Sequence, residues 1–124
     1  MSATATATSV QELDKQLNDD ILSGKIMDAF EKFYADDVVM QENSEEPRKG
    51  KADNRKAEEQ FMASVEAFHG ASVKASAVNG DVSFSEWEMD ISFKGGNRTK
   101  FNQVAVRQWK NGKIAHERFF YNKG

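Results

Sequence analysis

The chain has no cysteine, one proline and only two histidines among its 124 residues. Without cysteine there can be no disulfide, thiolate metal site or cysteine nucleophile, and this composition suits a reducing compartment, so we expect a cytoplasmic protein. His69 and His116 are too few for a histidine-rich metal centre, and we expect no metal. No apolar run reaches 18 residues, so we expect neither a membrane span nor a membrane partner.

Basic clusters are also missing. The formal net charge is −3 and the isoelectric point is about 5.4, which argues against nucleic acid as the main partner. The N-terminal segment MSATATATSV lacks the basic and leucine-rich stretches of a secretory signal. We therefore expect a short disordered lead over residues 1–8 and a single domain over residues 9–124.

Apolar periodicity predicts three helices in the first half of the chain. Val10, Leu13, Leu17 and Ile21 form one stripe behind Ser9, a plausible N-cap. A short helix is expected over residues 26–34 and the longest helix over residues 51–68. The early turns of the longest helix are densely charged, and we expect them to be solvated. Its expected buried stripe is Ala57, Phe61, Val65 and Phe68.

Strand patterns dominate the second half of the chain. A short strand is expected over residues 38–43. Further strands are expected over 73–78, from the turn at 79–81 to Phe93, over 101–109 and over 114–121. The turn sequences NGD, KGGNR and KNG separate the last four of them. This order predicts an α+β domain in which an antiparallel meander curls over helices on one face.

The element order, together with YADDVVMQEN, EPRKG and WKNGKIAHERFFY, resembles the NTF2-like superfamily, in particular its SnoaL-like small proteins. The YADD motif at residues 34–37, followed by EPR at 46–48 and Gly50, is similar to the ketosteroid isomerase branch. The resemblance implies a cone-shaped α+β barrel. In it, a curved antiparallel sheet wraps over a long helix and two N-terminal helices, encloses an apolar pocket, and commonly forms homodimers.

Glu42 is the catalytic candidate that this resemblance supplies. It lies eight residues after Tyr34, where the isomerase branch carries its catalytic Asp base. Strand alternation places Glu42 on the face of Val38 and Met40, and in an apolar cavity its pKa would rise, as a general base requires. The alternative is a strand-end carboxylate in water. The branch's two oxyanion donors fall near Leu17 and Ala105, which cannot donate, so steroid isomerase activity is not expected.

The last two strands supply the ligand-binding candidates, and the turn between them decides which side chains face inward. A three-residue loop with Gly112 in a bulge places Glu117 and Tyr121 on the face of Gln103 and Arg107. A two-residue Asn-Gly turn would present His116, Arg118 and Phe120 instead. The resemblance favours the first arrangement. The expected ligand-binding residues are Trp87, Gln103, Arg107, Glu117 and Tyr121.

Three functions remain open at this point. The first is a cofactor-independent isomerase- or cyclase-type enzyme that acts on a small apolar carbonyl or hydroxyl compound with Glu42 as base. The second is a non-catalytic module that binds such a molecule in the same pocket. For Arg107 and Glu117 themselves, the alternative to ligand binding is an internal pair that satisfies two half-buried charges. The third is a dimerisation module that works through its outer sheet face. A homodimer is expected through apolar residues of that face: Val82, Phe84, Val104, Val106, Ile114 and Phe120.

Overall fold

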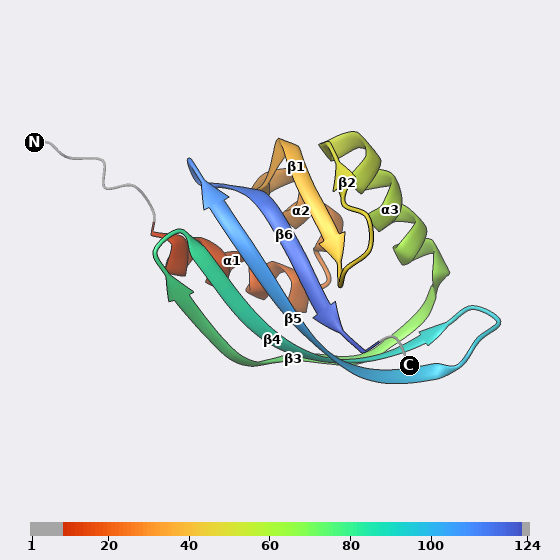
Figure 1. The fold of residues 1–124 in the computed structure, drawn as a ribbon. Helices are drawn as coiled ribbons and strands as arrows, with labels where there is room; N and C mark the ends of the chain where they lie inside the picture. The colour runs from red at the N-terminus through yellow and green to blue at the C-terminus, as the bar shows by residue number, and fades with distance from the viewer. Residues whose placement is uncertain (1–8, 123–124) are drawn as a thin grey trace, which may run out of the picture.

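The structure is a computed structural model that describes residues 9–122, so the lead expected over residues 1–8 lies outside the described residues. The described chain forms three helices and six strands (Figure 1). In chain order they are α1 (Val10–Leu22), α2 (Ile26–Phe33), β1 (Tyr34–Glu42), β2 (Arg48–Lys49), α3 (Lys51–Ser64), β3 (Val65–Asn79), β4 (Val82–Phe93), β5 (Arg98–Lys110) and β6 (Lys113–Tyr121).

The two N-terminal helices begin and end where the sequence indicates. Ser9 caps α1, and its hydroxyl accepts a hydrogen bond from the Glu12 amide at 3.1 Å. Gly24 has a φ of 82° and separates α1 from α2. Leu17 from α1, together with Phe30 and Phe33 from α2, is buried in one apolar core beneath the sheet. Burial of this apolar surface holds the helices against the strands.

The six strands form one curved sheet that does not close into a complete barrel. Their order is β2-β1-β6-β5-β4-β3, and the helices lie on the concave side of the sheet (Figure 1). Every pairing is antiparallel except that of β1 with β6, which is parallel. The predicted cone-shaped α+β fold is therefore confirmed, and the expectation of a wholly antiparallel sheet is wrong at this one pair.

The longest helix is shorter than predicted. α3 ends at Ser64, and β3 begins at Val65 and pairs with β4 along its length, from Val65 opposite Phe93 to Asn79 opposite Val82. Phe61 and Phe68 are 37% and 41% exposed, so the expected buried stripe is also wrong. These two aromatic rings line a cavity instead of packing into a solid core. A helical periodicity of apolar residues cannot by itself distinguish a solid core from a cavity wall. After Ser64, pairing of β3 with β4 replaces the helix that this periodicity predicts.

The turn between β5 and β6 is the two-residue turn that we did not favour. Lys110 pairs with Lys113, and Asn111 and Gly112 both have positive φ angles, 52° and 77°. A bulge then follows, because Trp109 pairs with Ile114 whereas Gln108 pairs with His116. The extra residue on β6 reverses the inward and outward faces from that point on. The predicted inward orientation of Glu117 is thus correct, but the bulge lies after the turn instead of within it.

This register also corrects one residue of the expected outer patch. Ile114 lies opposite Trp109, is fully buried and belongs to the core on the helix side of the sheet. The other five residues of the patch lie beyond the bulge or on β4 and β5. None of the helices that the structure describes is long and apolar enough to cross a membrane.

Candidate functional site

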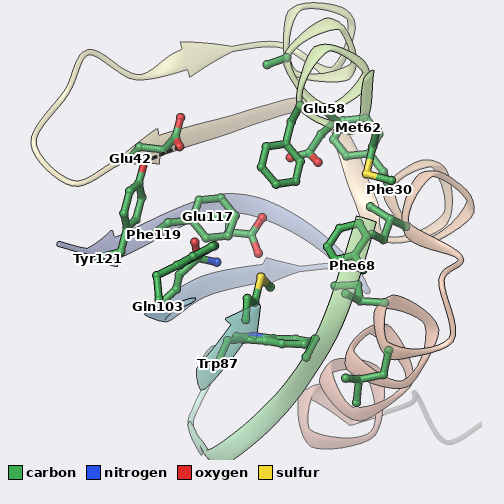
Figure 2. Close-up of a pocket in the computed structure, with 18 of the residues that line it drawn as sticks. Phe30, Glu42, Glu58, Met62, Phe68, Trp87, Gln103, Glu117, Phe119 and Tyr121 are labelled. Carbon is green, nitrogen blue, oxygen red and sulfur yellow. Dashed lines mark hydrogen bonds between the residues drawn. The ribbon is translucent and has the colours of Figure 1, made fainter. Parts of the chain in front are cut away.

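A cavity of about 860 Å³ lies between the concave face of the sheet and the three helices. This volume is in the range of pockets that hold small organic molecules. Aromatic rings form much of its wall, among them Phe61 and Phe93 together with Phe30, Phe68 and Phe119, the last three of which are labelled in Figure 2. All six residues that the sequence suggested for the site line this cavity: Glu42, Trp87, Gln103, Arg107, Glu117 and Tyr121.

The floor of the cavity carries a buried ionic network around Arg107. The Arg107 Nε donates to Glu117 Oε2 at 2.7 Å, and its Nη1 donates to Asp14 Oδ1 at 2.8 Å and to Asn18 Oδ1 at 2.7 Å. The Arg107 and Glu117 side chains are 2% and 0% exposed. Burial opposes the charge of Arg107, but the adjacent carboxylates outweigh it and raise the pKa of the guanidinium.

Further hydrogen bonds tie this network to β1 and β4. Tyr34 Oη donates to Glu117 Oε1 at 2.5 Å, and Ser83 and Ser85 donate to the two carboxylate oxygens of Asp14 at 2.7 and 3.2 Å. Burial, reinforced by the charge of Glu117, holds the pKa of Tyr34 well above its usual value. Arg107 and Glu117 therefore satisfy each other within the fold, the arrangement that the sequence left open as the alternative to ligand binding by this pair.

Glu42 is held by two partners at the end of β1. Its Oε2 accepts from Arg48 Nη1 at 3.0 Å and its Oε1 accepts from Tyr121 Oη at 2.8 Å. The side chains of Glu42 and Arg48 are each 34% exposed. The environment of Glu42 matches neither alternative in full, because the residue lines the cavity and its charge is balanced by Arg48 from β2. Burial and the hydrogen bond to Glu42 raise the pKa of Tyr121, so that hydroxyl keeps its proton.

Asn54 fixes the position of Arg48. The Asn54 side chain is fully buried at the first turn of α3. Its amide nitrogen donates to the backbone oxygens of Arg48 at 3.0 Å and Gly50 at 2.9 Å, while its oxygen accepts from Arg48 Nε at 3.2 Å. Gly50 adopts a φ of 91°, a conformation that favours glycine, at the junction between β2 and α3. This clamp holds Arg48 against Glu42.

Glu58 is the carboxylate in the cavity that lacks such a partner. It points inward from α3 towards the space that Glu117 enters from β6 (Figure 2). Its carboxylate makes no hydrogen bond within the described part of the chain. Burial, reinforced by the charges of Glu117 and Glu42 and opposed by Arg48, raises the pKa of Glu58 to about 7. A carboxyl group with such a pKa can accept and donate a proton near neutral pH.

Glu58 was missed by the sequence analysis. It lies among Asp53, Lys56 and Glu59 in the charged half of α3, which we expected to be solvated. One signal was available: Glu58 lies four residues before Met62 and three before Phe61, so it shares their side of the helix. Gln103 is the second polar side chain that points into the cavity without a hydrogen bond to another described residue (Figure 2).

Comparison with solved structures identifies the fold. A proposed SnoaL-like polyketide cyclase from Mesorhizobium loti is 31% identical, with a TM-score of 0.81 over 92% of this chain and 100% of that chain. A proposed SnoaL-like polyketide cyclase from Jannaschia sp. CCS1 is 12% identical, with a TM-score of 0.81 over 98% and 92% of the two chains. A proposed isomerase from Rhodopseudomonas palustris is 14% identical, with a TM-score of 0.74 over 94% and 92%.

The curved sheet, its three helices and the enclosed cavity define a protein of the NTF2-like superfamily. The sequence profile of the SnoaL-like domain matches residues 8–121, nearly the whole chain, so the protein belongs to the SnoaL-like family. Among curated proteins no significant match is found.

Proposed function

We propose that this protein binds a small, largely apolar molecule bearing a carbonyl or hydroxyl group and catalyses a proton transfer on it. The observation that carries the proposal is Glu58, a carboxyl group without a hydrogen-bond partner in the described structure, at the wall of an aromatic cavity. A fold of this kind hosts many activities, so the argument rests on the site and not on the family. Solved relatives described as a cyclase and an isomerase are compatible with such chemistry.

In this proposal Glu58 and Glu42, two of the carboxylates at the cavity wall, differ in role. Glu58 exchanges the proton, because no partner competes for its oxygens and burial favours its neutral form. Glu42 pairs with Arg48 and orients Tyr121 through the hydrogen bond that it accepts. Gln103, whose amide is free to donate and accept, orients the ligand. Glu42 as the base, suggested by its position after Tyr34, is the competing assignment, and the same experiment distinguishes the two.

The Kemp elimination of 5-nitrobenzisoxazole is a suitable assay, because this neutral aromatic probe reports on a carboxylate base in an apolar site. The base removes the C–H proton, the N–O bond breaks, and a coloured cyanophenolate leaves. We expect the rate to rise with pH to a plateau, with a midpoint near 7. Glu58→Gln should lower the rate about a hundredfold, in line with typical general-base contributions.

Two variants serve as controls for this assay. Glu59→Gln changes an exposed carboxylate next to Glu58 on the same helix and should leave the rate unchanged. Glu42→Gln should retain most of the activity. A large loss in Glu42→Gln with Glu58→Gln active would assign the base to Glu42. Probe binding without any turnover that depends on either residue would support the second candidate function, a non-catalytic binding module.

We further propose a homodimer through the outer face of the sheet. Phe84 and Phe120 are 37% and 41% exposed there, and strand pairing places Val106 beside Phe84 and Val104 beside Phe120. On the other side of Val106, strand pairing places Arg118 of β6, and on the other side of Val104 it places Glu86 of β4. A two-fold axis along the Phe84–Phe120 diagonal would bring Glu86 of one copy opposite Arg118 of the other, which favours a second copy of this chain as the occupant.

A further inference from the structure

The positive charges at the cavity wall are already neutralised. Arg48 and Arg107 are the arginines that line it, and no lysine or histidine does so within residues 9–122. Arg107 is bound by Glu117 and Asp14, and Arg48 by Glu42. A ligand carboxylate would therefore find no unbalanced cation in the described wall to pair with.

Negative charge is in excess at the same wall. Three carboxylates that line the cavity, Glu42, Glu58 and Glu117, stand against the two guanidinium groups, so the wall carries a formal excess of one negative charge when Glu58 is ionised. Glu58 and Gln103, two inward-pointing side chains that form no hydrogen bond with another described residue, are a carboxylate and a neutral amide. In a cavity with aromatic walls the low local dielectric strengthens the repulsion of a like charge.

We propose that the cavity selects its ligand by charge: it takes uncharged ligands such as alcohols, ketones, esters and lactones, and rejects free carboxylic acids at neutral and alkaline pH. The proposal rests on the proposed function for the existence of a small-molecule ligand and adds the class of that ligand. Glu58 is the group whose ionisation sets the discrimination, because it is the carboxylate that no arginine holds.

Groups on each surrounding element determine how this discrimination depends on pH. The charges of Glu117 and Glu42 act on Glu58 in one direction, and Arg48 is the cation that acts on it in the other. Protonation of Glu58 below about pH 7 removes the excess negative charge of the cavity wall. A ligand carboxylate should then enter more easily. The charged and titratable groups that face the cavity beside Glu58 are Tyr34 and Glu42 from β1, Arg48 from β2, Arg107 from β5, and Glu117 and Tyr121 from β6.

The test compares three ligands with one ring system, namely 9-anthracenemethanol, methyl anthracene-9-carboxylate and anthracene-9-carboxylate. Dissociation constants are measured by anthracene fluorescence with the full chain at pH 8 and pH 5.5. At pH 8 the alcohol and the ester should bind at least about tenfold more tightly than the acid. At pH 5.5 the acid is still ionised in solution, and it should bind about tenfold more tightly than at pH 8, a difference of about 1.4 kcal/mol in binding free energy. The affinities of the two neutral ligands should change less than about twofold between the two pH values.

Variants assign the effect to Glu58. Glu58→Gln should strengthen binding of the acid about tenfold at pH 8 and abolish its pH dependence, while Glu59→Gln should behave as the wild type. Binding of the acid as tight as that of the alcohol at pH 8 would overturn the charge selection and leave the proposed function intact. Failure of all three ligands to bind would overturn both, because the cavity would then not accept apolar molecules of this size.

Discussion

Replacing Glu58 by glutamine should stabilise the protein at pH 8 and leave its stability unchanged at pH 4. The pKa of Glu58 rises from 4.5 to about 7 on folding, mainly because burial disfavours the ionised form. The folded state therefore binds the proton more tightly than the unfolded chain, and ionisation of Glu58 costs stability as pH rises. The penalty begins near pH 4.5, grows up to about pH 7 and is constant above that value.

The size of the effect follows from the shift. Each pKa unit is worth about 1.4 kcal/mol, so the full penalty is about 3 kcal/mol. Glutamine has nearly the same shape as the protonated carboxyl group and carries no charge. The variant should thus match the wild type at pH 4 and exceed its free energy of unfolding by about 3 kcal/mol at pH 8.

Urea denaturation at intervals from pH 4 to pH 9 measures this difference. Glu59→Gln, at the exposed neighbouring position, is the matched control and should show no such pH dependence. Carbon-13 NMR titration of the Glu58 carboxyl group measures the pKa directly. A constant difference in stability between Glu58→Gln and the wild type over this pH range would refute the reasoning, because it would show that Glu58 titrates alike in the folded and unfolded states.

Two further predictions concern the buried network and the outer face. Arg107→Met should lower the free energy of unfolding by about 3–5 kcal/mol at pH 8, because Asp14 and Glu117 would remain buried without a cation. Urea denaturation measures this loss, and a variant as stable as the wild type would contradict it. Val106→Asp should convert a wild-type dimer into a monomer by placing a charge at the centre of the proposed interface. Sedimentation velocity at micromolar concentration measures this, and a wild-type monomer would contradict the interface.

Prediction from the sequence was most successful where the information was local. Ser9 and Gly24 bound α1 as expected, since capping and positive φ depend on adjacent residues. Strand alternation correctly placed Glu42 on the face of the buried residues Val38 and Met40. The inward-facing residues of β5 and β6 followed from alternation and the resemblance together, although the assumed turn was not the one that forms.

The tertiary structure alone decided the electrostatics of the site. Glu58 and Glu42 are identical side chains, and both line the cavity, yet only Glu42 meets a guanidinium group, because the Asn54 clamp brings Arg48 to the end of β1. The charged pattern around Glu58 indicated a solvated turn, since sequence shows which residues share a helix face but not what lies opposite that face.

The boundary between α3 and β3 has the same origin. Phe61 and Phe68 fit a continuous helical stripe, but pairing with β4 ends the helix at Ser64 and turns both rings to the cavity wall. Local periodicity thus determined the order of the elements and which side of each was apolar. The bulge at Ala115, the cavity and the pairing of its charges arose from contacts between residues far apart in the chain, which no local pattern encodes.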